Sequence, residues 1–360
     1  MKKMSAFTLS FSFVGCFLGA GYVSGQELWQ FFGSFGNIGY GGFLVSIVFF
    51  VTFGILLLRL TQQTGIEEVD LLLIPWNVPW LRKIVSYLQE ILLFSVAIIM
   101  TAGVAALLQQ IARIPRYIGA AVFVLLLWLM ALTGLQGMVR VFSALVPILV
   151  LATVLFAAAA YGKFGTDQIF QLEPCNNNPL TPNWLVASFT YVAYNMMAAI
   201  GILTPVGKMV KDKRTMYFGM ILGGVWMLGI AASIITSMAA YLPSTVTELP
   251  MVALATTISP FLGTVYGILL ILGMLCNGFA CFLTGMSFLE LKFPLFANRR
   301  KLSLAIAVLI IWGSSLLGFG DLIGVVYPVF GYCGVIFLLL ITVHYFRCLR
   351  NEKQIKRIKK

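Results

Sequence analysis

Long apolar runs alternate with short polar connections along the whole chain. A helix needs about 20 apolar residues to cross the hydrocarbon core of a bilayer. The chain is 60% hydrophobic and 10% charged, with a mean hydropathy of +0.98, whereas a soluble domain carries roughly 25% charged residues. The pattern predicts an all-α polytopic membrane protein with ten transmembrane helices, at 5–33, 39–61, 83–112, 116–134, 138–162, 184–206, 215–242, 258–291, 302–318 and 321–346.

A polar loop at 163–183 divides the predicted helices into five and five. An odd number of helices per half gives the two halves opposite orientations, and such inverted repeats are a known transporter architecture. The third helix of each half is unusually long, which supports the repeat. We predict a first repeat at 1–162, an external connecting loop at 163–183, a second repeat at 184–346 and a basic cytosolic tail at 347–360.

The stretch GAGYVSGQE, residues 19–27, interrupts the first predicted helix. Non-helical backbone at membrane depth is tolerated only where it is buried in protein or lines a wet cavity. The matching place in the second half reads AAIGILT, residues 198–204, and Pro205 follows it. The sequence therefore predicts discontinuous helices 1 and 6. A glycine face for close helix packing is the alternative, but it does not require the polar pair Gln26 and Glu27.

A break of this kind exposes backbone groups in the centre of the bundle. The N–H groups of Gly21 to Gly25 favour an anion such as a carboxylate, and the carbonyl groups of Phe17 to Ala20 suit Na⁺. Tyrosines and an amide of the sixth helix lie at a similar depth, with packing as the alternative role for the tyrosines. The predicted substrate-binding residues are Gly19, Ala20, Gly21, Tyr22, Ser24, Gly25, Tyr194, Asn195 and Gly201.

Polar residues inside predicted helices are candidates for coupling or gating. Glu27 is expected to carry a proton, to pair with a cationic solute or to act in an outer gate, or else to cap the outer half-helix. Glu90 either forms a structural ion pair with Arg140 or acts as a proton relay or inner gate. The predicted coupling or gating residues are Gln26, Glu27, Glu90, Asn277 and Thr284.

The charges of the chain fix the predicted topology. Of the 24 Lys and Arg residues, only Arg113, Arg116 and Lys163 fall in connections predicted to lie outside. This positive-inside bias places both termini in the cytosol and accounts for the net charge of +12. The basic tail is expected to lie against anionic lipid headgroups. It lacks interleaved aromatic residues, so we expect no nucleic-acid partner.

Enzyme signatures are not supported by the sequence. The G-x-G spacing at Gly19 and Gly21 has no preceding strand and no βαβ unit to bind a dinucleotide. With a single histidine, no Ser/His/Asp arrangement and no metal-ligand cluster is indicated. We therefore expect no enzymatic activity and no cofactor, apart from Na⁺ or H⁺ as a coupling ion.

The stretch GAGYVSGQELWQFFGSFG resembles the first-helix signature of the YkvI-like family of bacterial membrane proteins, with a close match over residues 15–36. That family is grouped with the amino acid–polyamine–organocation (APC) superfamily, which has the LeuT-type five-plus-five inverted repeat. The resemblance implies a bacterial plasma-membrane protein with its substrate between helices 1, 3, 6 and 8. It also suggests a Na⁺ site near Ala20 and Thr284. Thr284 lies deeper toward the cytosol than such sites require, so H⁺ remains an alternative coupling ion.

Together these features predict a secondary active transporter working by alternating access. Its solute is expected to be small and polar, an amino acid or a related carboxylate-bearing metabolite, with coupling to Na⁺ or H⁺. The alternative is a membrane-embedded receptor or signalling subunit that binds a ligand in the same pocket without net transport.

Overall fold

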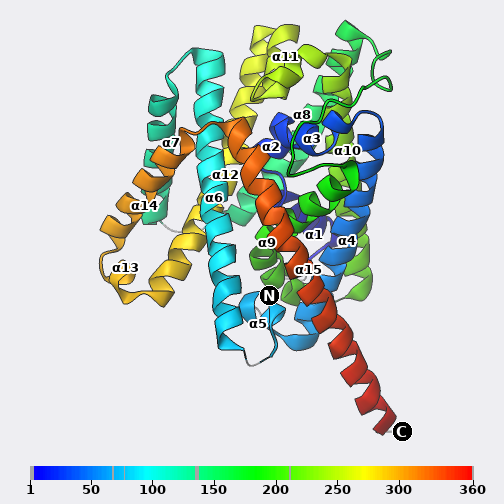
Figure 1. Cartoon of the computed structure of the whole chain (residues 1–360), viewed down its shortest axis with the longest axis vertical. Helices are drawn as coiled ribbons and strands as arrows, with labels where there is room; N and C mark the ends of the chain where they lie inside the picture. Colours follow the sequence, from blue (N-terminus) through cyan, green and yellow to red (C-terminus); the bar gives the residue numbers. More distant parts are fainter. Residues whose placement is uncertain (1–3, 67–68, 77, 134–137, 211, 359–360) are drawn as a thin grey trace.

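The computed structural model describes residues 4–66, 69–76, 78–133, 138–210 and 212–358, and among these residues it has helices and no strand (Figure 1). The helices are α1 (Ala6–Gly15), α2 (Ala20–Ser24), α3 (Gln26–Phe31), α4 (Ile38–Thr64), α5 (Val69–Leu73), α6 (Pro79–Ala112), α7 (Arg116–Thr133), α8 (Met138–Phe164), α9 (Trp184–Met209), α10 (Lys213–Ala240), α11 (Pro250–Ile258), α12 (Pro260–Lys292), α13 (Pro294–Asn298), α14 (Arg300–Ser315) and α15 (Phe319–Ile358). Two short 3₁₀ turns are η1 (Gly33–Phe35) and η2 (Leu242–Val246).

Each predicted span coincides with helical structure. Within the described residues, seven helices are long and apolar enough to cross a membrane, namely those containing Ile38–Thr64, Pro79–Ala112, Pro147–Phe164, Trp184–Gly201, Lys213–Ala240, Pro260–Lys292 and Phe319–Arg350. The other three predicted spans correspond to the interrupted segment α1–α3 and to the shorter helices α7 and α14. The chain is a multi-pass α-helical membrane protein.

Local sequence determines where several of these helices begin. The side chains of Ser5, Asn183 and Asp212 accept hydrogen bonds from backbone N–H groups in the first turns of α1, α9 and α10. Such N-cap contacts satisfy donors that have no partner inside the helix. The chain therefore enters the first, sixth and seventh spans at defined residues.

The first span is interrupted as the sequence predicts. Helix α1 ends at Gly15, and Gly19 has an extended backbone with φ −85° and ψ 178° just before α2. A second interruption follows at Gly25, whose φ of +85° places it in the left-handed region between α2 and α3. Glycine adopts this conformation without the steric cost that a side chain imposes. The stretch 16–25 is therefore a double break within the bundle.

The sixth span differs from the prediction, because α9 is one continuous helix from Trp184 to Met209. The predicted break at 198–204 is therefore corrected. Gly201 has no positive φ, and the helix runs on for four residues beyond position 205. A proline within a membrane helix is tolerated when neighbouring groups satisfy the freed carbonyl. A single glycine and a proline thus do not suffice to interrupt this helix.

The helices pack in a reciprocal way between the two halves. Helix α1 of the first half packs against α10 of the second, and α9 of the second half packs against α4 of the first. The two long helices α6 and α12, of 34 and 33 residues, pack against each other. Suppose that the first span is exchanged with the sixth, the second with the seventh and the third with the eighth. The same pairs of helices are then in contact. This is the packing of a five-plus-five inverted repeat.

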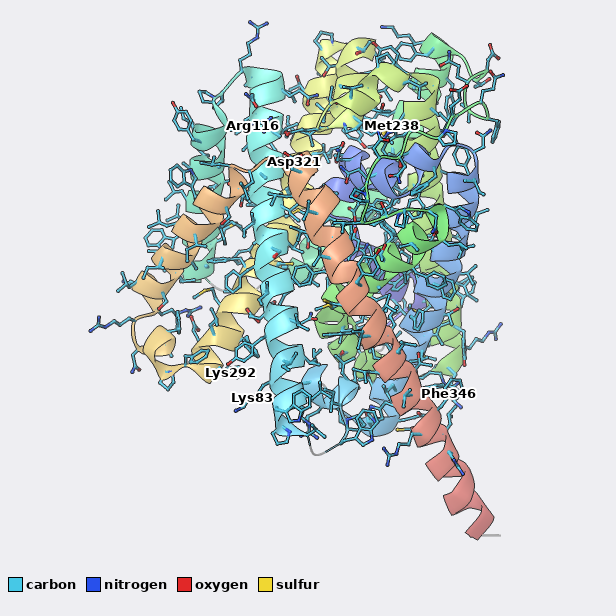
Figure 2. The ribbon with its side chains drawn as sticks, viewed as in Figure 1. Lys83, Arg116, Met238, Lys292, Asp321 and Phe346 are labelled. Carbon is cyan, nitrogen blue, oxygen red and sulfur yellow. The ribbon has the colours of Figure 1, made fainter. Side chains whose placement is uncertain are left out.

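Labelled charged residues mark the two ends of the bundle. Lys83 and Lys292 lie at one end, whereas Arg116 and Asp321 lie at the other (Figure 2). Figure 1 places α5 and the projecting C-terminal part of α15 at the same end as Lys83, and α11 at the opposite end. We call the end with Lys83 and Lys292 the inner end, because the positive-inside bias predicts it to be cytosolic, and the other the outer end.

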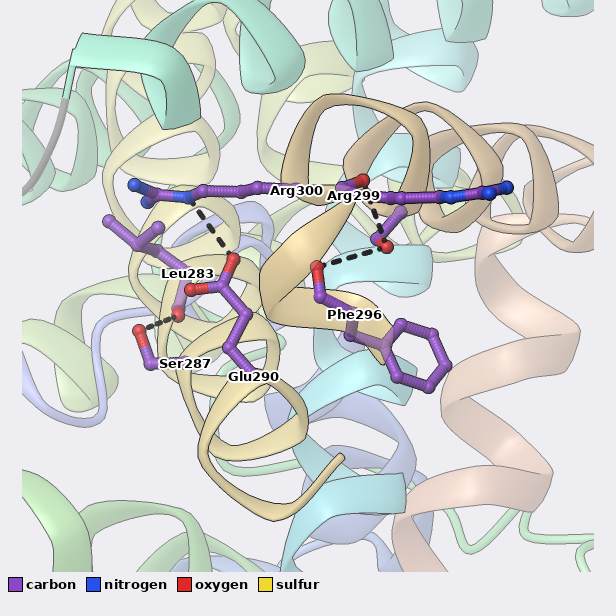
Figure 3. A network of polar contacts seen from close by, with 7 residues as sticks. Leu283, Ser287, Glu290, Phe296, Arg299 and Arg300 are labelled. Carbon is purple, nitrogen blue, oxygen red and sulfur yellow. Dashed lines mark hydrogen bonds and ion pairs between the residues drawn. The ribbon is translucent and has the colours of Figure 1, made fainter. Parts of the chain in front are cut away.

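Polar contacts hold the turn that joins α12 to α14 at the inner end (Figure 3). The guanidinium Nε of Arg300 lies 3.1 Å from Oε1 of Glu290. The Ser303 hydroxyl donates to the carbonyl oxygens of Phe296 and Arg299, both at 3.2 Å. These contacts fix the short helix α13 between the two spans.

Candidate functional site

Two adjoining cavities lie along the path from the inner end to the broken first span. The larger, which we call the vestibule, has a volume of about 480 Å³ and is lined by residues of α5, α6, α9 and α12. The smaller, which we call the central pocket, has about 30 Å³ and lies against the break, with room for about one water molecule. Ala198 and Cys281 line both cavities. The central pocket therefore adjoins the inner end through the vestibule.

Glu27 is the charged residue that lines the central pocket. Its side chain is 3% exposed, and it reaches back over α2, so that Oε2 lies 2.5 Å from where a Cβ on Gly21 would be. The side chain of Asn195, on α9, lines the same pocket. The Asn195 amide also donates to the carbonyl oxygen of Tyr191 at 3.0 Å. The bare backbone at Gly21 is what allows the carboxylate to lie there.

Aromatic rings form one wall of the central pocket. Tyr194 of α9 and Tyr327 of α15 stack with ring centroids 4.4 Å apart and an interplanar angle of 12°. Both rings line the pocket and are nearly fully buried. In the described part of the chain the Tyr194 hydroxyl has no hydrogen-bond partner. The wall thus combines two ring faces with an unpaired hydroxyl.

Helix α12 contributes the opposite side of the pocket. The Nδ2 atom of Asn277 lies 2.9 Å from where a Cβ on Gly19 would be, which shows how closely this amide approaches the break. The Cys281 thiol, one turn further toward the inner end, donates to Oδ1 of Asn277 at 3.6 Å. The pocket is therefore bounded by the first, third, sixth, eighth and tenth spans.

Two of the backbone N–H groups predicted to receive an anion have other partners. The Val23 N–H donates to the Gly19 carbonyl at 3.2 Å, and the Gly25 N–H donates to the Tyr22 carbonyl at 3.2 Å. They are engaged because the outer half of the span already begins at Ala20. The prediction of free N–H groups at these two residues is therefore corrected.

Several other predicted site residues support the break rather than line the pocket. The Tyr22 hydroxyl donates to the Met227 carbonyl of α10 at 2.7 Å. The Ser24 hydroxyl donates to the Gly21 carbonyl at 3.2 Å and accepts from the Gln26 N–H at 3.4 Å. These contacts fix α2 and α3 in place. The side chain of Ala20 lies outside the described residues.

The vestibule collects three residues that the sequence analysis placed at the site, namely Gly201, Glu90 and Thr284. Thr284 follows Asn277 by seven residues on α12, which is about 10 Å along a helix. The structure therefore does not bring Thr284 to the level of the break, where Na⁺ was predicted. Glu90 is buried, its Oε1 has no hydrogen-bond partner among the described residues, and Lys292 is its charged neighbour. The side chain of Arg140, its predicted partner, lies outside the described residues.

A group of polar side chains, which we call the outer cluster, lies on the outer side of the site: Gln26, Gln30, Arg116 and Glu248. The guanidinium of Arg116 pairs with Glu248 at 3.1 Å, and Gln30 Nε2 donates to the Gly320 carbonyl at 3.2 Å. Gln26 and Glu248 both lie next to Gly320, near the start of α15. The cluster joins α3, α7 and α15 above the central pocket.

Tyr327, Cys281 and Ala198 line the central pocket but are absent from the predicted site. Tyr327 had a sequence signal, since a tyrosine followed by Pro328 stands within an apolar span. Ala198 begins the stretch 198–204 and Cys281 lies one turn from Asn277, but neither was selected, because small side chains occur throughout such helices. Their place at the junction of the two cavities depends on how α9 and α12 face each other.

The chain is similar in sequence to known bacterial proteins. No protein-family model matches the chain. It is 24% identical over 94% of its length to the "Uncharacterized membrane protein YkvI" of Bacillus subtilis (strain 168), of which it covers 95%. It is 26% identical over 92% of its length to the "Uncharacterized protein YyaD" of the same organism, of which it covers 94%.

Solved structures share the fold at low sequence identity. The chain superposes on MhsT in complex with L-phenylalanine with a TM-score of 0.65, at 14% identity, over 94% of this chain and 89% of that one. On the Eremococcus coleocola manganese transporter in complex with an aromatic bis-isothiourea substituted compound, the TM-score is 0.57, at 14% identity, over 95% and 87%. These neighbours are transporters rather than enzymes.

These likenesses confirm the resemblance read from residues 15–36. The chain is similar to YkvI over nearly its whole length and has the LeuT-type transporter fold.

Proposed function

We propose that the protein is a secondary active transporter that carries a small polar solute by alternating access, coupled to Na⁺ or H⁺. The observation that carries the proposal is the one-sided access to the central pocket. The vestibule adjoins the pocket at Ala198 and Cys281, whereas the outer cluster closes the other side. A closed outer side and an open inner side are expected of one state in an alternating-access cycle.

Amino acids are the first solutes to test, because MhsT was solved with L-phenylalanine. Manganese is the second, because the other neighbour is a manganese transporter. For coupling, the separation of Thr284 from the break gives H⁺ better support than Na⁺, with the buried carboxylates Glu27 and Glu90 as carriers. We place the protein in a bacterial plasma membrane with both termini in the cytosol and the basic end of α15 against anionic headgroups.

The test is solute uptake into proteoliposomes under an inward Na⁺ gradient, an inward H⁺ gradient or neither. We expect uptake above that of empty liposomes, and only with one of the two gradients. Solute binding to the purified protein without uptake under any gradient would favour the receptor alternative.

A matched pair of variants ties this uptake to the central pocket. In Gly19→Val the new side chain meets Nδ2 of Asn277, while the extended backbone at this position suits a β-branched residue. Gly41→Val adds the same side chain on α4, where nothing lies within 4 Å. We expect uptake to be lost in Gly19→Val and kept in Gly41→Val.

A further inference from the structure

We propose that the central pocket binds the positively charged end of its solute, an ammonium or another small organic cation, through the carboxylate of Glu27. This rests on the proposed function and deepens it, since it assigns a charge class to the solute. It also changes the expectation drawn from the sequence, in which a carboxylate of the solute is bound at the break.

Among the described residues that line the central pocket, Glu27 has no positively charged partner. The carboxylate is 3% exposed, and none of the described residues lining the pocket is Lys, Arg or His. The acidic residues paired in the described ion pairs are Glu248 and Glu290, and neither of them lines the pocket. A buried carboxylate is costly unless it is paired. A bound cation would supply that missing partner.

The Glu27 carboxylate itself lies at the break of the first span. Oε2 of Glu27 lies against Gly21, on the outer half of the broken span, where the sequence suggested the solute carboxylate. The N–H groups of Val23 and Gly25 are already engaged. An anionic group entering the pocket would therefore meet another carboxylate and would find those donors taken. Like charges at close range disfavour binding.

The remaining walls of the central pocket also suit a cation. The stacked rings of Tyr194 and Tyr327 line the pocket, and aromatic ring faces attract cations. The Asn277 amide approaches from α12 and offers a carbonyl oxygen that accepts from the Cys281 thiol. A carboxylate, two aromatic rings and an amide oxygen together form a site for an N–H donor or an alkylated cation.

The volumes of the two cavities suit a small charged head and a larger remainder. The central pocket of about 30 Å³ holds a group of about one heavy atom with its hydrogens. The vestibule of about 480 Å³ begins at Ala198 and Cys281 and can take an uncharged remainder. The inference is thus an ammonium head at Glu27 with its chain directed toward the inner end.

Three probes of matched carbon chain separate the charge classes. Butylammonium carries only the ammonium group, pentanoate carries only a carboxylate, and norvaline is butylammonium with a carboxylate added on the first carbon. Binding to the purified full-length protein is measured by thermal shift and calorimetry, up to roughly 50 mM, because ligands of so few atoms bind weakly. We expect the affinity to fall in the order butylammonium, norvaline, pentanoate.

Two variants test whether Glu27 sets this order. In Glu27→Gln the affinity for butylammonium should fall about tenfold or more, and the preference over pentanoate should disappear. The matched control is Glu290→Gln at the inner turn, which lines neither cavity and should keep the preference. The melting curve of each variant checks that it is folded, and Glu27→Asp, which keeps the charge, should retain part of the affinity.

The outcomes separate this inference from the proposed function. Glu27-dependent binding of butylammonium without uptake into liposomes would support the cation site and remove the transporter. Uptake of a solute whose charge preference is the same in Glu27→Gln would keep the transporter and overturn the cation site. Tighter binding of pentanoate or norvaline, or no butylammonium binding by a cooperatively melting protein, also overturns it.

Discussion

Gly21 matters because of what its missing side chain permits. A Cβ at this position would lie 2.5 Å from Oε2 of Glu27, so even alanine must push the carboxylate away from α2. We predict that Gly21→Ala weakens solute binding about tenfold or more, while the melting temperature changes little. The measurement is the affinity for butylammonium beside a melting curve.

The matched control for that prediction is Gly41→Ala, because nothing lies within 4 Å of the added methyl group there. It should leave affinity and melting temperature close to those of the unmodified protein. Equal affinities in Gly21→Ala and Gly41→Ala would show that the position of the Glu27 carboxylate is not critical.

Gly25 has a different role, in which substitution affects stability. Its φ is +85°, and a Cβ would lie 2.6 Å from Sδ of Met238. We predict that Gly25→Ala lowers the free energy of unfolding by about 1–3 kcal/mol, the usual cost of a non-glycine residue held in such a conformation. Thermal unfolding measures the loss, and a melting temperature equal to that of Gly41→Ala would contradict the assignment.

At the residue scale the sequence was informative where a residue type was out of place. A carboxylate and an amide within apolar spans pointed to Glu27 and Asn195, and both line the central pocket. Gly201 was placed at the same centre but lines the vestibule, together with Thr284, which the sequence placed deeper toward the cytosol. Depth along a span follows from residue number, whereas the direction a side chain faces depends on packing between helices.

At the element scale the two predicted breaks had different outcomes. The first span is broken where glycines at 19, 21 and 25 meet polar residues, and two of these positions have non-helical torsions. The sixth span has one glycine and one proline in the matching place, and α9 remains continuous. Helices α4 and α15 pack against α9. Such tertiary contacts decide whether a weak interruption signal breaks a helix.

The outer cluster provides a test of how elements close over the pocket. Arg116 at the start of α7 pairs with Glu248 in the segment before α11. Both side chains are partly exposed, so the pair is worth about 1 kcal/mol or less. We predict that Arg116→Glu slows uptake by up to roughly fivefold, because the outer side closes less often.

Charge exchange separates that effect from damage at either site. The double variant Arg116→Glu with Glu248→Arg restores the opposite charges and should recover most of the uptake rate. An uptake rate unaffected by Arg116→Glu, or a double variant slower than both single variants, would rule out the pair as part of the outer closure.

At the scale of the whole molecule, the reciprocal packing of the two halves gives a reason to expect a second state. Helix α1 packs on α10 as α9 packs on α4, so the halves can exchange their conformations with little change in the pairs that touch. The structure has the vestibule adjoining the central pocket at the inner end. The state with exchanged halves would open the pocket at the outer cluster.

The helical, membrane-spanning character of the chain and the broken first span could be predicted from the sequence, because each rests on local composition. The direction in which access is open could not, because it depends on contacts between residues far apart, such as Arg116 with Glu248. The continuity of α9 could not be predicted either, because it also depends on contacts between residues far apart in the sequence.

The most direct test of alternating access is the reactivity of two single cysteines with a membrane-impermeant maleimide. They are Thr284→Cys in the vestibule and Gln26→Cys in the outer cluster, each in a background lacking the six native cysteines. We predict that Thr284→Cys reacts from the inner side and that Gln26→Cys is protected from the outer side. Adding Arg116→Glu should slow the first reaction and speed the second. Rates that move together, or that do not change, would contradict alternating access around the broken first span.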